Sequence, residues 1–266
     1  MSDPLQLQLS GAPFGASPSF MELLRAEHPD ALPVGPDGPP FPLTHATTVL
    51  GLKFADGIVM AGDRRATAGN IIADPKMRKV FAADRLSAIA IAGVAGQAIE
   101  MVKLFQLELE HYEKITGDRL SLDGKANRLA QMIRGNFPLA MQGLVVVPLF
   151  GGYDERRSEG RIFYYDATGG RWEENDYQTT GSGGAPAKNS LKKRWKPGID
   201  RDAALRVAAE ALIDAADDDS ATGGPDATRG LWPIMVVVTA AGASDVPEAD
   251  VIAAVDAVLA ERRNAP

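Results

Sequence analysis

The hydroxyl side chains of this sequence include one that could act as a nucleophile without a histidine. The chain contains no Gly-x-Ser-x-Gly motif, and its three histidines, His28, His45 and His111, lie far apart. A Ser–His–Asp site stays open, but no motif supports it. A threonine at the start of a chain supplies its own base, because its α-amino group has a pKa of about 8. Such a threonine must open a β-strand behind a removable segment, and Thr47 occupies that position.

A threonine nucleophile also needs a nearby cation and a carboxylate that holds the cation. A lysine beside the hydroxyl lowers the pKa of that hydroxyl. The pair Thr47-Thr48 precedes a β-rich stretch, Asp63 follows the next β-rich stretch, and Lys79 begins a third. Taken alone, Lys79 is typical of a surface lysine and Asp63 of a turn residue. Together with Thr47, they form a candidate catalytic set.

The elements expected around these residues come in runs of strands with helices gathered between them. This order indicates an α+β fold rather than the alternating order of a parallel sheet. The expected helices run from about 99 to an end at Gly117, from 124 to 142 with a kink or boundary at Pro138, and over 202–216 and 247–262. The expected strands are 48–54, 58–61, 79–82, 87–92, 144–150, 161–166, 177–180 and 233–239.

The composition excludes several classes of function. The net charge of −7 argues against binding to nucleic acid, which depends on basic patches. Without cysteine there is no thiol catalysis and no disulfide, and the histidines show no metal-ligand spacing, so we expect no metal and no cofactor. No apolar run approaches the roughly 18 residues of a membrane span, and no secretory signal is apparent. We therefore expect a cytoplasmic protein that does not associate with a membrane.

The first 46 residues differ from the rest because they contain nine prolines, which exclude a continuous helix or a central strand. A capping box formed by Ser19 and Glu22 predicts a short amphipathic helix over about 20–26. A disordered tail with one nascent helix explains the same pattern. We interpret residues 1–46 as a removable propeptide and residues 47–266 as the catalytic domain.

Several motifs in register resemble the β subunits of the 20S proteasome, most of all those of actinobacteria. The motifs are His-Ala-Thr-Thr at 45–48, Gly-Asp-Arg-Arg-Ala-Thr at 62–67, Lys79, and Ile-Ala-Gly-Val-Ala-Gly at 91–96. Their spacing matches the family without an insertion, and the similarity runs from Thr47 to about Arg262. The resemblance implies the N-terminal nucleophile hydrolase fold, a four-layer αββα sandwich of two antiparallel sheets flanked by helices.

The resemblance also implies roles for individual residues. Thr47 is similar to the nucleophile of the family, Lys79 to its activating lysine and Asp63 to the carboxylate that pairs with this lysine. Gly93 stands where a backbone N–H stabilises the oxyanion, and a residue without Cβ permits close approach of the substrate. Ser182, within Gly-Ser-Gly at 181–183, resembles the serine that completes the site.

Residues 219–224 resemble the Asp-x-x-Ser-Gly-Gly signature of the family, which implies that Asp219 and Thr222 surround the α-amino group of Thr47. Taken alone, these residues are typical of a solvated acidic helix end, and 181–184 of a flexible loop. The pocket for the substrate side chain before the cut bond carries no charge, which favours cleavage after hydrophobic residues. Its matching positions are Ala66, Thr67, Met77, Phe81, Ile91, Ala95 and Ile99.

The chain departs from the family pattern at two positions. Ala46 stands where glycine usually precedes the nucleophile, and its Cβ narrows the backbone angles available for self-cleavage. Either maturation is slower or this lineage tolerates alanine. Thr222 stands where serine is usual, and its hydroxyl can form the same hydrogen bonds.

The family implies partners as well as a reaction. Its β subunits form two inner rings of seven between two outer rings of α subunits, and they degrade unfolded protein delivered by a ring ATPase and, in actinobacteria, marked by a small protein tag. Three alternatives remain. They are the shorter bacterial relative that forms six-membered rings, another N-terminal nucleophile amidohydrolase, and an inactive structural β-type subunit, which should have lost Thr47 or Lys79.

We predict that maturation cuts the bond between Ala46 and Thr47, because the composition changes there and the Thr-Thr pair follows. N-terminal sequencing of the assembled protein should begin at Thr47. A mature subunit that begins at any other residue would contradict this cleavage site.

Overall fold

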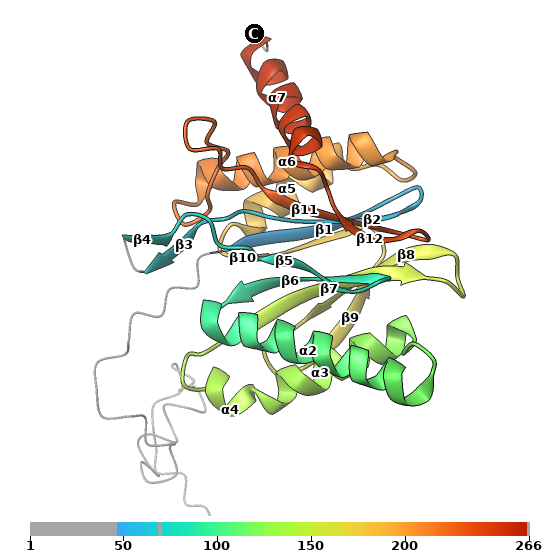
Figure 1. The fold of residues 1–266 in the computed structure, drawn as a ribbon. Helices are drawn as coiled ribbons and strands as arrows, with labels where there is room; N and C mark the ends of the chain where they lie inside the picture. Colours follow the sequence, from blue (N-terminus) through green and yellow to red (C-terminus); the bar gives the residue numbers. More distant parts are fainter. Residues whose placement is uncertain (1–46, 69–70, 265–266) are drawn as a thin grey trace, which may run out of the picture. The chain divides into compact units, whose positions relative to one another are not determined.

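The computed structural model describes residues 47–68 and 71–264. Their helices and strands, shown in Figure 1, alternate in runs along the chain. In order they are β1 Thr48–Phe54, β2 Gly57–Gly62, β3 Ala66–Ala68, β4 Ile71–Asp74, β5 Val80–Asp84, β6 Ser87–Gly93, α2 Ala95–Thr116, α3 Leu122–Gly135, α4 Phe137–Ala140, β7 Val146–Asp154, β8 Glu159–Tyr165, β9 Arg171–Glu174, β10 Tyr177–Gly181, α5 Gly184–Arg194, α6 Arg201–Asp218, β11 Ile234–Thr239, β12 Gly242–Asp245 and α7 Glu248–Asn264.

The strands form two five-stranded antiparallel sheets and one small hairpin. The first sheet has the order β10-β1-β2-β11-β12, the second has the order β5-β6-β7-β8-β9, and β3 pairs with β4. Helices α5 and α6 cover the outer side of the first sheet, and α2 and α3 cover the outer side of the second (Figure 1). The predicted α+β class and the four-layer sandwich are therefore confirmed.

The two faces of each sheet bury different side chains, because successive residues of a strand point to opposite faces. In β1, Val49 belongs to the apolar layer between the sheets, where Met60, Ala90 and Leu149 are also fully buried. The neighbouring Leu50 points to the other face of the sheet. Central strands such as β2 and β6 are buried on both faces, which fixes their register.

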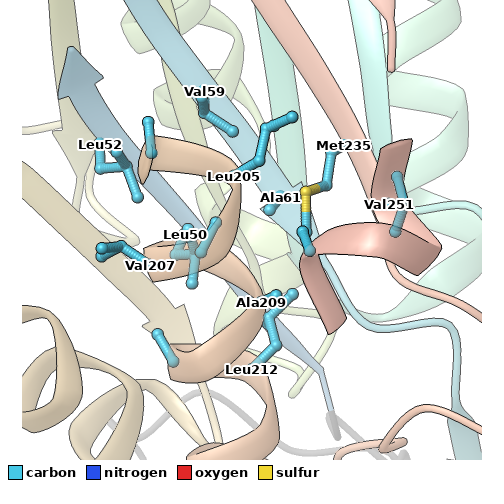
Figure 2. Close-up of a cluster of buried hydrophobic side chains, with 14 of the residues drawn as sticks. Leu50, Leu52, Val59, Ala61, Leu205, Val207, Ala209, Leu212, Met235 and Val251 are labelled. Carbon is cyan, nitrogen blue, oxygen red and sulfur yellow. The ribbon is translucent and has the colours of Figure 1, made fainter. Parts of the chain in front are cut away.

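Figure 2 shows the layer between the first sheet and its helices. Leu50 and Leu52 of β1 and Val59 and Ala61 of β2 pack against a cluster of side chains from the helices. That cluster includes Leu205, Val207, Ala209 and Leu212 of α6 and Val251 of α7. Asp200 begins α6 by accepting a hydrogen bond from the Ala203 N–H at 2.8 Å.

The sequence predicts the long elements well and misses the short ones. Helix α2 ends at Thr116, and the next residue is Gly117, whose φ of 76° is left-handed, as expected for the glycine that the sequence places at this helix end. The helix expected over 124–142 ends earlier, at Gly135, and Pro138 lies in the short helix α4. Strands β3, β4, β9 and β12 and helix α5 were not predicted. These strands have three or four residues each, and α5 begins within a glycine-rich stretch.

Three further expectations concern the propeptide, membrane-spanning helices and metal sites. The short helix expected over 20–26, His28, His45 and Ala46 lie outside the described residues. Over the described segments, the structure contains no helix with the length and apolar character needed to cross a membrane. The same segments contain no cluster of three or more His, Cys, Asp or Glu side chains arranged to hold a metal ion.

The aromatic cluster between the second sheet and α2 should dominate the stability of that layer. Phe150 is fully buried, with its ring centroid 5.6 Å from that of Phe105 and 6.1 Å from that of Phe163. Phe150→Ala should lower the free energy of unfolding by about 3–5 kcal/mol, as measured by chemical denaturation. Phe137→Ala removes the same atoms from a ring that is 38% exposed and should cost much less. Equal losses in the two variants would contradict this view of the core.

Candidate active site

Asp63 and Lys79 form an ion pair that joins the two sheets. Asp63 follows the last residue of β2 in the first sheet, and Lys79 precedes the first residue of β5 in the second sheet. The Lys79 Nζ donates a hydrogen bond to the Asp63 Oδ1 at 2.7 Å, and both side chains are 0% exposed. A cation and a carboxylate separated by 15 residues in the sequence are thus brought together inside the protein.

The carboxylate of Asp63 accepts hydrogen bonds on both oxygens. Its Oδ1 also accepts from the Thr48 N–H at 2.9 Å, and its Oδ2 accepts from the N–H groups of Arg65 at 2.8 Å and Gly223 at 2.9 Å. A carboxylate has about four acceptor positions, so this set fills them. The orientation of Asp63, and through it the position of the Lys79 ammonium group, is therefore fixed.

Burial lowers the pKa of Lys79 below its ordinary value, because a charged ammonium group is disfavoured away from water. The charge of Asp63 and its hydrogen bond oppose this shift, and Asp219 opposes it more weakly. The Lys79 Nζ also donates a hydrogen bond to the Arg65 carbonyl oxygen. The contacts with Asp63 and Arg65 thus hold the ammonium group in a fixed place and oppose the effect of burial.

Four side chains form a second hydrogen-bonded group, which we call the hydroxyl chain: Thr48, Thr222, Asp219 and Ser182. The Thr48 and Thr222 hydroxyl oxygens are 2.6 Å apart. The Thr222 hydroxyl donates to the Asp219 Oδ2 at 2.6 Å, and the Ser182 hydroxyl donates to the same oxygen at 2.5 Å. The structure thus brings Ser182, Asp219 and Thr222 together, as the sequence analysis expects.

Burial alone would raise the pKa of Asp219, but other interactions outweigh it. Hydrogen bonds from Ser182, Thr222 and the Ala221 N–H, together with the charge of Lys79, hold the pKa of Asp219 below its ordinary value. The carboxylate is therefore ionised at neutral pH. It can accept two hydroxyl protons at once.

The loop from 181 to 183 approaches the start of β1 so closely that two of its residues must be glycine. A Cβ on Gly181 would lie 1.7 Å from the Thr47 carbonyl oxygen, and its φ of +100° disfavours any other residue. A Cβ on Gly183 would lie 2.3 Å from the Thr48 hydroxyl oxygen. Thr47 itself is only 5% exposed at this point.

Gly93 is the last residue of β6, and its φ is +120°. A Cβ there would lie 2.1 Å from the Val145 carbonyl oxygen. The Ile91 N–H donates to the Lys79 carbonyl oxygen at 2.9 Å, so Gly93 lies two residues along the strand that contacts the Lys79 segment. Its role at the oxyanion stays a prediction.

Comparison with known proteins decides the family. A family model described as proteasome subunit matches residues 43–226, which is more than half of the chain. A proteasome subunit beta of Acidimicrobium ferrooxidans is 53% identical over 233 residues, which cover 87% of this chain and 85% of the relative. A proteasome subunit beta of Streptomyces griseus is 55% identical over 230 residues, which cover 85% and 82%. The chain belongs to the proteasome subunit family.

Proteasome β subunits are threonine peptidases, and the similarity to β subunits over most of the chain confirms the function predicted from the sequence. The chain is therefore a hydrolase of peptide bonds that works within a proteasome together with other subunits.

The structure groups part of the predicted substrate pocket of this proteasome subunit. One apolar cluster between the second sheet and α2 contains four of the predicted positions: Met77, Phe81, Ile91 and Ile99. Ile91 is buried, whereas Met77, Phe81 and Ile99 are only partly buried. Ala95 opens α2, and Ala66 and Thr67 begin β3. The uncharged character of the cluster agrees with a preference for apolar side chains, and the participation of all seven positions stays a prediction.

Three contributors to the site were not predicted: the side chain of Thr48 and the backbone N–H groups of Arg65 and Gly223. The role of the Thr48 side chain could have been suspected from its position next to Thr47 in the sequence. The two backbone donors leave no mark in residue types, because every residue except proline has an N–H.

Gly181→Ala should impair the peptidase, because the new Cβ displaces the carbonyl group of Thr47. A displacement of about 1 Å in a reacting group costs about a hundredfold in rate, and we expect a loss of this size for hydrolysis of a fluorogenic peptide. Gly135→Ala is the matched control, since a Cβ at this helical position meets no atom within 4 Å. Full activity of Gly181→Ala would show that the approach of this loop does not matter for catalysis.

Proposed function

We propose that Thr47 is the nucleophile of this proteasome subunit and becomes its first residue when residues 1–46 are removed. The observation that carries the proposal is the buried pair of Lys79 and Asp63, because Asp63 also binds the N–H of Thr48, the residue that follows Thr47. The removal is autocatalytic: the Thr47 hydroxyl oxygen attacks the carbonyl carbon of Ala46, the C–N bond between Ala46 and Thr47 breaks to free the amine of Thr47, and water then hydrolyses the ester that joins the propeptide to the hydroxyl. The same hydroxyl then serves in peptide hydrolysis.

In the proposed reaction, the Thr47 hydroxyl oxygen attacks the carbonyl carbon of the substrate while its proton passes to the α-amino group of Thr47. The cation of Lys79 lowers the pKa of the hydroxyl. The Gly93 N–H donates to the oxyanion of the tetrahedral intermediate. When the C–N bond breaks, the proton moves to the leaving amine, and water later hydrolyses the ester formed with Thr47.

The ionised Asp219, with Ser182 and Thr222, would hold the α-amino group of Thr47 in place for this proton transfer. The support is the low pKa of Asp219 and the two hydroxyl groups that fix its Oδ2. The uncharged pocket selects apolar side chains before the cut bond. Its members are Ala66, Thr67, Met77, Phe81, Ile91, Ala95 and Ile99.

The proposed setting is a four-ring particle in the cytoplasm, with this chain in the two inner rings of seven and α subunits in the outer rings. Unfolded protein is the substrate, delivered by a ring ATPase and a protein tag. The propeptide is proposed to act during assembly and to protect the amine of Thr47 until the particle closes.

Lys79→Ala should abolish both peptide hydrolysis and propeptide removal, with a loss of at least about a hundredfold in turnover. Loss of the cation raises the pKa of the Thr47 hydroxyl and leaves Asp63 buried without its partner. Turnover of a fluorogenic peptide and the intact mass of the subunit in particles purified with the α partner measure the two effects.

Lys125→Ala is the matched control, because Lys125 is also buried and also pairs with a carboxylate, that of Asp84. This variant should lose stability but keep both propeptide removal and turnover per assembled particle. Near-normal turnover of Lys79→Ala, or an equal loss in the two variants, would refute the specific role of Lys79.

A further inference from the structure

We infer that Thr48, the residue after the nucleophile, is a positioning residue of the reaction. It binds both hydrogen-bonded groups of the site: the ion pair of Asp63 and Lys79, and the hydroxyl chain. The inference rests on the proposed role of Thr47. Thr48 is 0% exposed, so its side chain cannot contact solvent or a partner molecule. Its side chain and its backbone each bind a different group.

The backbone of Thr48 is fixed on Asp63 by two reciprocal hydrogen bonds. The Thr48 N–H donates to the Asp63 Oδ1 at 2.9 Å, and the Asp63 N–H donates to the Thr48 carbonyl oxygen at 3.1 Å. The same Oδ1 accepts from the Lys79 Nζ at 2.7 Å. The peptide that joins Thr47 to Thr48 is therefore held at a set distance from the Lys79 ammonium group.

The side chain of Thr48 reaches in the other direction, to the hydroxyl chain. The single hydroxyl proton of Thr222 goes to the Asp219 Oδ2 at 2.6 Å, so the 2.6 Å contact between Thr222 and Thr48 must use the proton of Thr48. Donation thus runs from Thr48 through Thr222 to Asp219. Without the Thr48 hydroxyl, Thr222 would lose the partner that fixes the position of its oxygen.

The surrounding loop can approach the Thr48 hydroxyl group closely because residue 183 is a glycine. Gly183 has no Cβ, and a Cβ there would lie 2.3 Å from the Thr48 hydroxyl oxygen and 2.6 Å from that of Thr222. Gly181 pairs with Thr48 across the first sheet. The close approach of this loop is thus built around the contact between the two threonine hydroxyl groups.

The consequence is alignment of the nucleophile. Thr47 is bonded directly to Thr48, and Thr48 is held at three points: its N–H by Asp63, its carbonyl oxygen by the Asp63 N–H, and its hydroxyl group by Thr222. Rate depends strongly on such alignment, because the reacting atoms must be held near attack geometry. Loss of the hydroxyl should therefore lower kcat more than it changes KM.

The test compares Thr48→Val, which keeps the branched Cβ but replaces the hydroxyl with a methyl group, with Thr48→Ser, which keeps the hydroxyl. Both are measured in full particles purified with the α partner, with a fluorogenic peptide as substrate. Loss of one hydrogen bond in the alignment should lower kcat by about tenfold in Thr48→Val. KM should stay unchanged, and Thr48→Ser should keep a kcat close to that of the unaltered particle.

A double-mutant cycle shows whether Thr48 acts through Thr222. If it does, Thr48→Val should add little to the loss already caused by Thr222→Val, so the two effects are not additive. Fully additive losses, an unchanged kcat in Thr48→Val, or an equal loss in Thr48→Ser would each overturn the inference. Thr48→Ala serves where valine blocks assembly, and failure of both hydroxyl-free variants to assemble would show a role in folding instead.

Thr47→Ala separates this inference from the proposed function. If Thr47→Ala particles still hydrolyse the peptide, the assignment of the nucleophile fails, and the role of Thr48 fails with it. If Thr47→Ala is inactive while Thr48→Val turns over normally, the nucleophile stands and only the role of Thr48 is wrong.

Discussion

The buried ion pair of Lys79 and Asp63 is the interaction on which the rest of the site depends. Removing two charges from water costs several kcal/mol for each ion, so a buried pair is weak support for stability by itself. Here the cost is offset by hydrogen bonds from Thr48, Arg65 and Gly223 to the carboxylate and by the Arg65 carbonyl group, which accepts from the lysine. An apolar pair of similar size could fill the space. The charge is therefore explained by the proposed reaction, in which Lys79 is the cation that lowers the pKa of the Thr47 hydroxyl.

The packing of the two sheets brings the end of β2 close to the start of β5, and this places the two charged residues of the site side by side. Gly62 makes the approach possible, because a Cβ there would lie 2.9 Å from a methyl group of Val49 and 3.1 Å from one of Val80. The next residue in the chain is Asp63, and the residue before Val80 is Lys79. The packing between the two sheets thus sets the distance within the ion pair, and the pair needs no flexible loop to form.

How much of this the sequence could predict depended on the range of each interaction. Long helices such as α2 and α6 can be predicted from the periodicity of their own apolar residues and from the residues at their ends. The short strands β3 and β9 depend instead on pairing with a neighbouring strand. In the site, Thr47, Asp63 and Lys79 were predicted from their residue types and from their resemblance to the family motifs. The backbone donors of Arg65 and Gly223 were not, because their position follows from the course of the chain. Helix α5 was missed because packing, rather than intrinsic propensity, stabilises a helix that begins Gly-Ala-Pro.

The two hydrogen-bonded groups of the site are coupled by charge as well as by Thr48. Donation along the hydroxyl chain runs toward Asp219 only while that carboxylate is ionised, since a protonated Asp219 would offer its own proton to Thr222 or Ser182. Lys79 is one of the groups that hold the pKa of Asp219 down, and Asp219 in turn helps to retain the proton of Lys79 against burial. Protonation of either group therefore changes the other. The orientation of the hydroxyl groups and the charge of Lys79 are set together, although Asp219 and Lys79 lie in different parts of the chain.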